Sequence, residues 1–175
     1  MERWGYNMIR KATVADAEGI ARVHVDCWRT TYKDIISEKF LTNLSYEQRT
    51  KLWVNNISRK NDSVFVAVND DEKIIGFTSG GNVKLGEYQG YDGDVTSIYI
   101  LKKFQGLGIG KKLLKRLFTE FESLNFHSVI VKVLEENKSC HFYEAMGAEI
   151  IDSTSIKMAD DNLKLLVYGW EDIST

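Results

Sequence analysis

A glycine-rich turn followed by two lysines is the feature of this sequence with the clearest chemical meaning. Residues 105–112 read QGLGIGKK and open an amphipathic helical pattern. The first amides of a helix have no intrahelical partner and carry a partial positive charge, so a lysine there is unfavourable by about 0.3 to 1 kcal/mol. An anion bound to the same amides removes this conflict. The turn therefore predicts a phosphate-binding site.

Two familiar phosphate-binding motifs do not fit this turn. A Walker A loop needs glycine at the position of Gln105 and serine or threonine at the position of Lys112. The dinucleotide fingerprint GxGxxG also fails, because its third glycine falls on Lys111 or on Leu113. The sequence therefore does not indicate a kinase, a GTPase or an NAD-dependent enzyme.

The composition is that of one soluble domain spanning residues 1–175, with 43% hydrophobic and 27% charged residues. A net charge of -2 and a pI near 6.0 argue against a general nucleic-acid binder. Cys27 and Cys140 match no metal-ligand spacing, so we expect reduced thiols and no metal site. Residues 1–7 lack an apolar signal core, and no apolar run approaches the roughly 20 residues of a membrane helix. We therefore expect a cytoplasmic protein with no membrane partner.

The first half of the sequence predicts several helices and one hairpin. A short strand is expected at 8–10, and 13–16 resembles a capping box that starts a helix carrying Ile20, Val23 and Cys27. Ser37 and Ser45 look like two further helix starts. The strand-like runs 63–68 and 73–78 flank the turn residues NDDE and predict an antiparallel hairpin.

The second half predicts a strand, a helix and a second strand around the glycine turn. Residues 80–93 are rich in Gly, Asn and Asp and are expected to form a mobile surface loop that could border a substrate. A central strand at 95–101 precedes the turn, and a strand at 128–133 follows the helix, which implies a right-handed parallel crossover. A short helix at 137–147 and strands at 149–152 and 163–170 complete the sheet. The apolar stripe of the long helix consists of Ile109, Leu113, Leu114, Leu117, Phe118, Phe121 and Leu124.

Most of the chain resembles the GNAT superfamily of N-acetyltransferases, and the resemblance is most specific from Asp94 to Gly147. The turn matches the family motif Q/R-x-x-G-x-G/A, and the strand at 98–100 and the segment 137–147 occur in the family's order and spacing. The resemblance implies a single-domain α/β fold with a mixed, mostly antiparallel sheet, a splayed central pair of parallel strands, and flanking helices. Lys102 and Lys103 replace the proline that is common after the central strand, and Gln105 stands where arginine is more frequent.

The resemblance implies acetyl-CoA as cosubstrate. The pantetheine arm would pair with the backbone of the central strand, the pyrophosphate would bind the amides of the turn, and Lys111 would add charge. Lys112, Lys115 and Arg116 could reach the 3′-phosphate, although solvated surface side chains are an equally good interpretation. The implied cofactor-binding residues are Ile98, Tyr99, Ile100, Gln105, Gly106, Leu107, Gly108, Ile109, Gly110, Lys111, Asn137, Phe142 and Tyr143.

Two side chains are implied to take part in catalysis. Tyr143 corresponds to the family's tyrosine that faces the leaving sulfur as a general acid, and Asp94 lies where related sequences often have a glutamate that accepts the amine proton, directly or through water. A lysine-like amine costs about 4.6 kcal/mol to deprotonate at pH 7, whereas an aspartate with a pKa near 3.9 is a poor proton acceptor. Asp94 must therefore be perturbed by burial, act through water, or only attract a cation. A surface carboxylate at Asp94 and a packed aromatic ring at Tyr143 are the structural alternatives, and His141 is expected to be structural or solvent-facing.

The amine acceptor is predicted less sharply than the cofactor. Trp28 and Tyr32 lie four residues apart, which places them on one helix face, and the resemblance implies that this region borders the acceptor pocket. Glu87, Asp92 and Asp94 favour a cationic amine, carried by a small molecule or a peptide. Peptide N-terminus, polyamine, amino acid and antibiotic all remain open as acceptors.

A second function class is also compatible with the sequence. The chain could bind acyl-CoA without turning it over, as a sensor or an interaction domain. The candidate acid Tyr143 argues against this alternative. Exposed terminal strands make a homodimer possible.

Overall fold

The computed structural model describes residues 9–174, which form a seven-stranded sheet with helices on both faces. The strands are β1 (Ile9–Lys11), β2 (Ser63–Val68), β3 (Ile74–Asn82), β4 (Gly93–Ile100), β5 (Val129–Leu134), β6 (Glu149–Met158) and β7 (Asp161–Trp170). The helices are α1 (Ala17–Thr31), α2 (Glu38–Thr42), α3 (Tyr46–Ser58), α4 (Ile109–Ser123) and α5 (Ser139–Ala145), with short 3₁₀ turns η1 (Val14–Asp16) and η2 (Lys102–Phe104).

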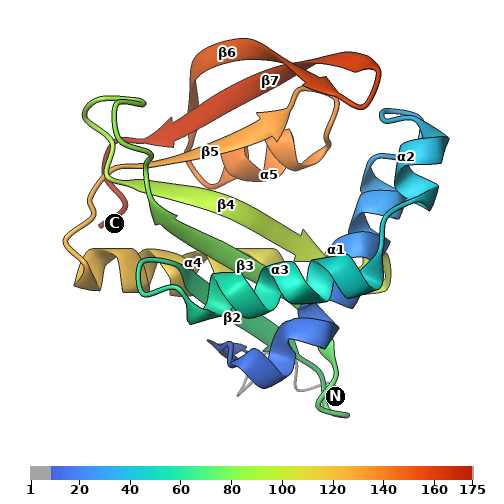
Figure 1. Cartoon of the computed structure of the whole chain (residues 1–175). Helices are drawn as coiled ribbons and strands as arrows, with labels where there is room; N and C mark the ends of the chain where they lie inside the picture. Colours follow the sequence, from blue (N-terminus) through green and yellow to red (C-terminus); the bar gives the residue numbers. More distant parts are fainter. Residues whose placement is uncertain (1–8, 175) are drawn as a thin grey trace.

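The sheet has the strand order β1-β2-β3-β4-β5-β7-β6, and β4 and β5 are its parallel pair. The other neighbouring strands pair in antiparallel fashion. Figure 1 shows β4 and β5 close together at one end and diverging towards the other. The predicted fold class, mostly antiparallel with a splayed parallel pair, is confirmed.

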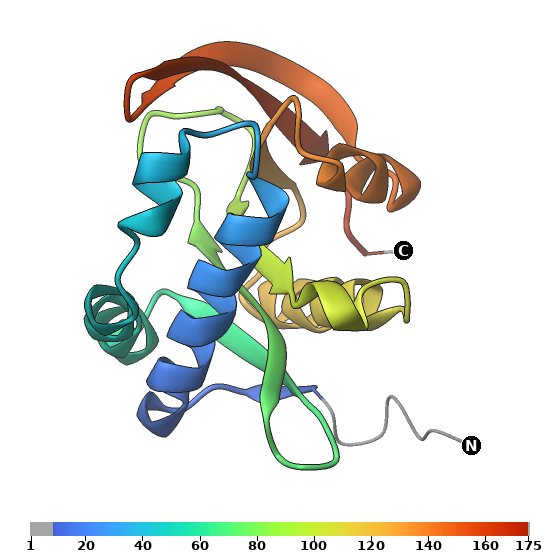
Figure 2. The same ribbon diagram turned by 90° about the vertical axis from the view of Figure 1, so that its right-hand side faces the viewer.

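Helices α1, α2 and α3 lie on one side of the sheet, and α4 and α5 lie on the other (Figure 2). The amphipathic α4 buries its predicted stripe in the larger core cluster, together with apolar residues of β4, β5 and β7. Helix α1 packs with Trp53 of α3 and Phe77 of β3 in a second cluster. Leu124 is the exception to the predicted stripe: it lies just after the end of α4 and its side chain is 45% exposed.

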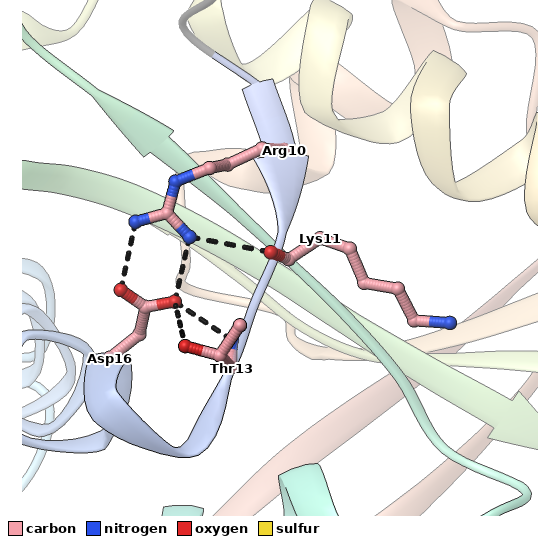
Figure 3. Close-up of polar contacts among 4 residues, drawn as sticks. All are labelled: Arg10, Lys11, Thr13 and Asp16. Carbon is pink, nitrogen blue, oxygen red and sulfur yellow. Dashed lines mark hydrogen bonds and ion pairs between the residues drawn. The ribbon is translucent and has the colours of Figure 1, made fainter.

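An ion pair near the beginning of the described chain fastens β1 to the start of α1. The Arg10 guanidinium donates two hydrogen bonds to the carboxylate of Asp16, at 2.8 and 2.9 Å (Figure 3). The same carboxylate accepts the Thr13 amide at 2.8 Å, which is the capping contact predicted from the sequence. The hydrogen bonds from Arg10 lower the pKa of Asp16.

Several predicted boundaries differ from the structure. The predicted loop 80–93 is shorter, because Gly80 belongs to β3 and Gly93 begins β4, which leaves residues 83–92 as the β3–β4 loop. Strand β6 continues to Met158, well beyond the predicted end at Asp152. Its later residues are largely exposed, and they form a strand because they pair with β7. Met8, at which the predicted first strand begins, lies outside the described residues.

A β-bulge shapes the central strand. The pairing of β4 with β3 shifts by one residue between Val95 and Ser97, so Thr96 is an extra residue in β4. Without the bulge, Asp94 and Ser97 would project from opposite faces of the sheet. With it, both project from the face that α1 and α3 cover.

Candidate active site

The opening between β4 and β5 leaves one edge of β4 without a strand partner. The parallel pairing covers 93–95 of β4 and 129–131 of β5, after which β4 pairs with β3 alone. The Leu101 amide donates to Ile75 in β3 at 2.9 Å, so the alternating backbone groups of Ile98 and Ile100 point towards the opening. The Ile100 carbonyl accepts a hydrogen bond from the side chain of Gln105 at 2.9 Å. The remaining edge is suited to pair with an extended ligand.

The glycine turn presents free helix amides to solvent. Gly106 and Gly108 have φ values of 79° and 82°, a left-handed conformation that glycine adopts without strain. The first intrahelical bond joins the Lys112 amide to the Gly108 carbonyl, so the amides of residues 109–111 are the unpaired first amides of α4. Gly110 lets α4 approach β4, because a Cβ there would lie 3.1 Å from the Ile100 side chain. This arrangement has the unpaired amides that the sequence predicts for an anion cradle.

Two details of the predicted phosphate contacts are different. The Gln105 amide donates to the Lys102 carbonyl at 3.3 Å, so this residue contributes its side chain to β4 and not an amide to the cradle. Arg116 lies over the Phe65 ring at 4.5 Å and pairs with Glu120 at 3.8 Å, on the side of α4 that packs against the sheet. Lys111 and Lys115 are exposed on the helix surface.

A cavity of about 160 Å³ lies at the opening between β4 and β5. Its wall brings together predicted residues of all three classes: acceptor, cofactor and catalytic. It is lined by Trp28, Tyr32, Val95, Thr96, Ser97, Ile98, Tyr99, Val131, Lys132, Val133, Leu134, Asn137, Ser139, Tyr143, Ile156, Met158 and Leu165.

Tyr143 forms part of the cavity wall on the α5 side. Its side chain is 5% exposed and packs against Phe142, Tyr168 and Trp170, with ring centroids 5.4 to 6.2 Å apart. Burial raises the pKa of Tyr143, so the phenol stays protonated over the physiological range. It can donate a hydrogen bond into the cavity.

Asp94 lies at the rim of the opening and is not among the residues that line the cavity. Burial raises its pKa to about 6, and the charge of Lys132 partly opposes this effect. A carboxylate with this pKa is a better proton acceptor than an ordinary aspartate. On β4 beyond Asp94, the hydroxyl of the cavity-lining Ser97 contacts Ser79, which in turn contacts Thr96 at 2.8 Å.

Trp28 and Tyr32 contact each other on one face at the end of α1, as their spacing predicts, with ring centroids 4.7 Å apart. Trp28 donates its indole N–H to the Tyr99 hydroxyl at 3.0 Å, and Asn137 donates to the Tyr32 hydroxyl at 3.4 Å. The Asn137 side chain also accepts the Ser139 amide at 2.8 Å, in the turn that leads into α5. A hydrogen-bonded aromatic wall therefore joins α1, β4 and the start of α5.

His24 reinforces this wall and is a residue that the sequence reasoning missed. Its ring stacks on Tyr99 at 5.6 Å, and its Nδ1 accepts the Trp53 indole N–H at 3.0 Å. Burial lowers the pKa of His24 to about 4, so the ring is neutral and supports Tyr99 without charge. His141, by contrast, has a side chain 88% exposed and lies within 3.7 Å of Glu144, outside the cavity.

Two of the three carboxylates that favour a cationic amine in the sequence, Asp92 and Glu87, make structural contacts. Asp92 accepts the amides of His127 and Ser128 at 2.8 and 3.3 Å, which fastens the start of β4 to the start of β5. Glu87 pairs with Lys132 at 3.0 Å. Two of the three carboxylates that favoured a cationic acceptor are therefore engaged in structural contacts, and the cationic acceptor stays a prediction.

Comparison with known proteins decides the family. The family model described as "Acetyltransferase (GNAT) family" matches residues 20–148. The chain belongs to the GNAT acetyltransferase family. It is 37% identical over 166 residues to the "Uncharacterized N-acetyltransferase YuaI" of Bacillus subtilis (strain 168), which covers 95% of this chain and 94% of the relative.

Solved structures share the fold of this GNAT acetyltransferase. The PaiA N-acetyltransferase of Thermoplasma acidophilum, crystallised in complex with coenzyme A, has a TM-score of 0.72 and 21% identity, over 90% of this chain and 96% of that one. The ribosomal-protein-alanine N-acetyltransferase of Brucella melitensis has a TM-score of 0.73 and 24% identity, over 93% and 98% of the two chains.

Two properties of the described residues bear on the kind of site. None of the helices in residues 9–174 has the length and apolar character needed to cross a bilayer. In the same part of the chain, no three His, Cys, Asp or Glu side chains are grouped to hold a metal ion. Cys27 and Cys140 are buried free thiols with raised pKa values, so neither is an activated nucleophile.

Proposed function

We propose that this protein transfers the acetyl group of acetyl-CoA to a primary amine, by direct attack within a ternary complex. One observation carries the proposal: the opening between β4 and β5 begins beside an exposed anion cradle and ends at a cavity that Tyr143 lines. A pantetheine chain runs from a diphosphate to a thiol, so both ends of coenzyme A find a matching surface along one path.

The residues present fit this cosubstrate. Amides of 106–111 would hold the pyrophosphate, and Lys111 would add a positive charge beside it. The backbone of Ile98 and Ile100 would pair with the amides of the arm, while Asn137 and Phe142 would lie along it. Tyr99 would form the floor beneath the thioester.

Acetyl transfer requires three events at the cavity. The amine loses a proton, its nitrogen forms a bond to the carbonyl carbon as the carbon–sulfur bond breaks, and the departing thiolate takes up a proton. Asp94, with a pKa of about 6, would accept the amine proton through water or through the hydroxyls around Ser97. Ordinary aspartate would be weaker by about two pKa units, or roughly 3 kcal/mol.

Tyr143 would stabilise the leaving sulfur mainly by hydrogen bonding. Because burial raises its pKa, full proton transfer to a thiolate with a pKa near 8.5 is uphill by more than about 2 kcal/mol. A hydrogen bond that strengthens as charge develops on sulfur does not require complete transfer. Trp28 and Tyr32 would form the acceptor side of the same cavity.

The deciding experiment combines calorimetry with an assay for free thiol. Acetyl-CoA is first titrated into the protein, and thiol release is then measured with a panel of primary amines. We expect saturable binding and amine-dependent release. Tight binding without release on any amine would instead identify a sensor or interaction domain, and absence of binding would exclude both functions.

A further inference from the structure

The acceptor side of the cavity carries a positive charge that the sequence did not predict. Among the described residues that line the cavity, Lys132 is the charged one. It interrupts the otherwise apolar β5, and its side chain is 30% exposed. A wall whose charge comes from a lysine is poorly suited to an acceptor with several positive charges.

The partner of Lys132 can be exchanged. Glu87 reaches Lys132 from the β3–β4 loop at 3.0 Å, and its own side chain is 40% exposed. Lys132 also lies 5.7 Å from the centre of the Tyr88 ring, and the Tyr88 hydroxyl donates to Asp152 at 3.0 Å. An ion pair this exposed is screened by solvent and contributes little to stability. A carboxylate from a ligand can therefore replace Glu87 at small cost.

Asp94 stands on the same face as Lys132, on the adjacent strand. Asp94 pairs in register with Ile130, two residues before Lys132. Standard strand spacings put the Cα atoms of Asp94 and Lys132 on the order of 8 Å apart. The groups whose charges act on Asp94 are Lys132, Glu87 and Lys84. The rim thus offers an acidic and a basic group on one face of two adjacent strands, matching a molecule that carries both an amine and a carboxylate.

We propose that the acetyl acceptor is a free amino acid, whose amine lies towards Asp94 and whose carboxylate binds Lys132 in place of Glu87. This inference rests on the proposed function. Among the acceptors that the sequence left open, a peptide N-terminus lacks the carboxylate next to the amine, and a polyamine would bring further positive charge to Lys132. The cavity of about 160 Å³ holds the reacting amine and acetyl group, so the amino acid side chain lies towards solvent.

Matched substrates test this assignment. Thiol release from acetyl-CoA is measured with each common amino acid, with the corresponding amino acid amide, and with putrescine and spermidine. We expect at least one amino acid to show a kcat/KM about tenfold or more above that of its amide and of both polyamines, because a charge-assisted hydrogen bond is lost in the amide.

Three variants assign the preference to Lys132. K132M is expected to abolish the amino acid preference by raising KM about tenfold, while the amide changes less than about threefold. E87Q is expected to lower KM for the amino acid, because it removes the competing carboxylate. K164M is the matched control: Lys164 pairs with Glu135 at 3.1 Å in the same manner but does not line the cavity.

The outcomes separate this inference from the proposed function. Release with amides or polyamines at rates equal to or above those of every amino acid would overturn the inference and leave the acetyltransferase proposal standing. An equal loss on amino acid and amide in K132M would also overturn it. Absence of release with every amine would overturn both.

Discussion

The cofactor side and the acceptor side of the cavity are built in different ways. The anion cradle comes from consecutive residues, with the left-handed Gly106 and Gly108 leading directly into α4. The acceptor side combines the end of α1, the β3–β4 loop, the middle of β5 and the β6–β7 hairpin. Figure 1 shows the hairpin tip beside α2, where Ile156 and Leu163 pack against the cluster that contains Tyr32. A backbone motif can be found locally, whereas a surface assembled from distant side chains cannot.

The two sides also differ in how charge is used. The lysines at the start of α4 are exposed, at an end of the helix that favours negative charge. On the acceptor side, most charged groups are engaged: Asp92 fastens two strands and Glu87 holds Lys132. The number of carboxylates close together in the sequence is therefore a poor guide to the charge that is available at the acceptor site. Mutations on the cofactor side and mutations on the acceptor side of the cavity should therefore change different measured quantities.

The largest expected effect is at Tyr143, where the two sides meet. Tyr143→Phe keeps the buried ring and removes the hydrogen-bond donor, so we expect kcat to fall about 100-fold. The dissociation constant of acetyl-CoA, measured by calorimetry, should change little. An undiminished kcat would show that the residue only packs.

Replacing Asp94 should lower the activity of the enzyme and raise the stability of its fold. The folded chain holds the Asp94 proton more tightly than the unfolded chain, so its stabilising effect is complete below about pH 3.8 and is lost as the pH rises through about 6. Asp94→Asn should therefore stabilise the protein at pH 7.5 by about 1 to 3 kcal/mol, and much less at pH 4. Thermal unfolding at both pH values measures this gain.

The same variant tests the role of Asp94 in catalysis. Asp94 can accept the amine proton only after it has lost its own, so log(kcat/KM) of the native enzyme should rise with a slope of about one below pH 6 and level off above it. In Asp94→Asn the amine must lose its proton to solvent, so the slope of about one should continue above pH 6 without a break. An unchanged profile would remove Asp94 from the mechanism while leaving the stability result intact.

Gly108 tests the cofactor side alone. Alanine at φ 82° is strained by roughly 1 to 2 kcal/mol and disturbs the amides of the cradle, so the dissociation constant of acetyl-CoA should rise about tenfold. Gly86→Ala is the matched control, because Gly86 has φ 85° and equally open surroundings but lies in the β3–β4 loop. Equal effects of the two variants on cofactor affinity would argue against the cradle.

Replacing Asp16 should affect neither the cofactor side nor the acceptor side of the cavity. Asp16→Asn weakens the ion pair with Arg10 and should destabilise the fold by about 1 kcal/mol at pH 7. The effect is small because Arg10 is 46% exposed and solvent partly screens the ion pair. Since the Arg10 contact lowers the pKa of Asp16, this stabilisation exists above about pH 3.8 and disappears as the pH falls below it. The difference in melting temperature from the native protein should therefore vanish in acid, with kcat/KM unchanged at pH 7.5.

Much of the fold follows from sequence patterns because each pattern reports local burial. The stripe of α4 and the β2–β3 hairpin are examples. Strand β6 was predicted only to Asp152, because its later residues are polar or exposed and their conformation comes from pairing with β7. His24 and Lys132 gave weak signals: a histidine within an apolar helix face, and one lysine inside an apolar strand.

The sequence by itself determined the glycine turn that opens α4, the amphipathic helices and the position of Tyr143 in a short helix after β5. These features depend on backbone conformation and on spacing along a few consecutive residues, which physical chemistry constrains locally. Only the tertiary structure decided which charges remain available and what surrounds the acceptor. Burial raises the pKa of Asp94, and the bulge at Thr96 places Asp94 and Ser97 on the same face of the sheet. Glu87 reaches Lys132 from a distant loop. Such properties depend on groups brought together across the fold, because burial and electrostatic interaction act through space.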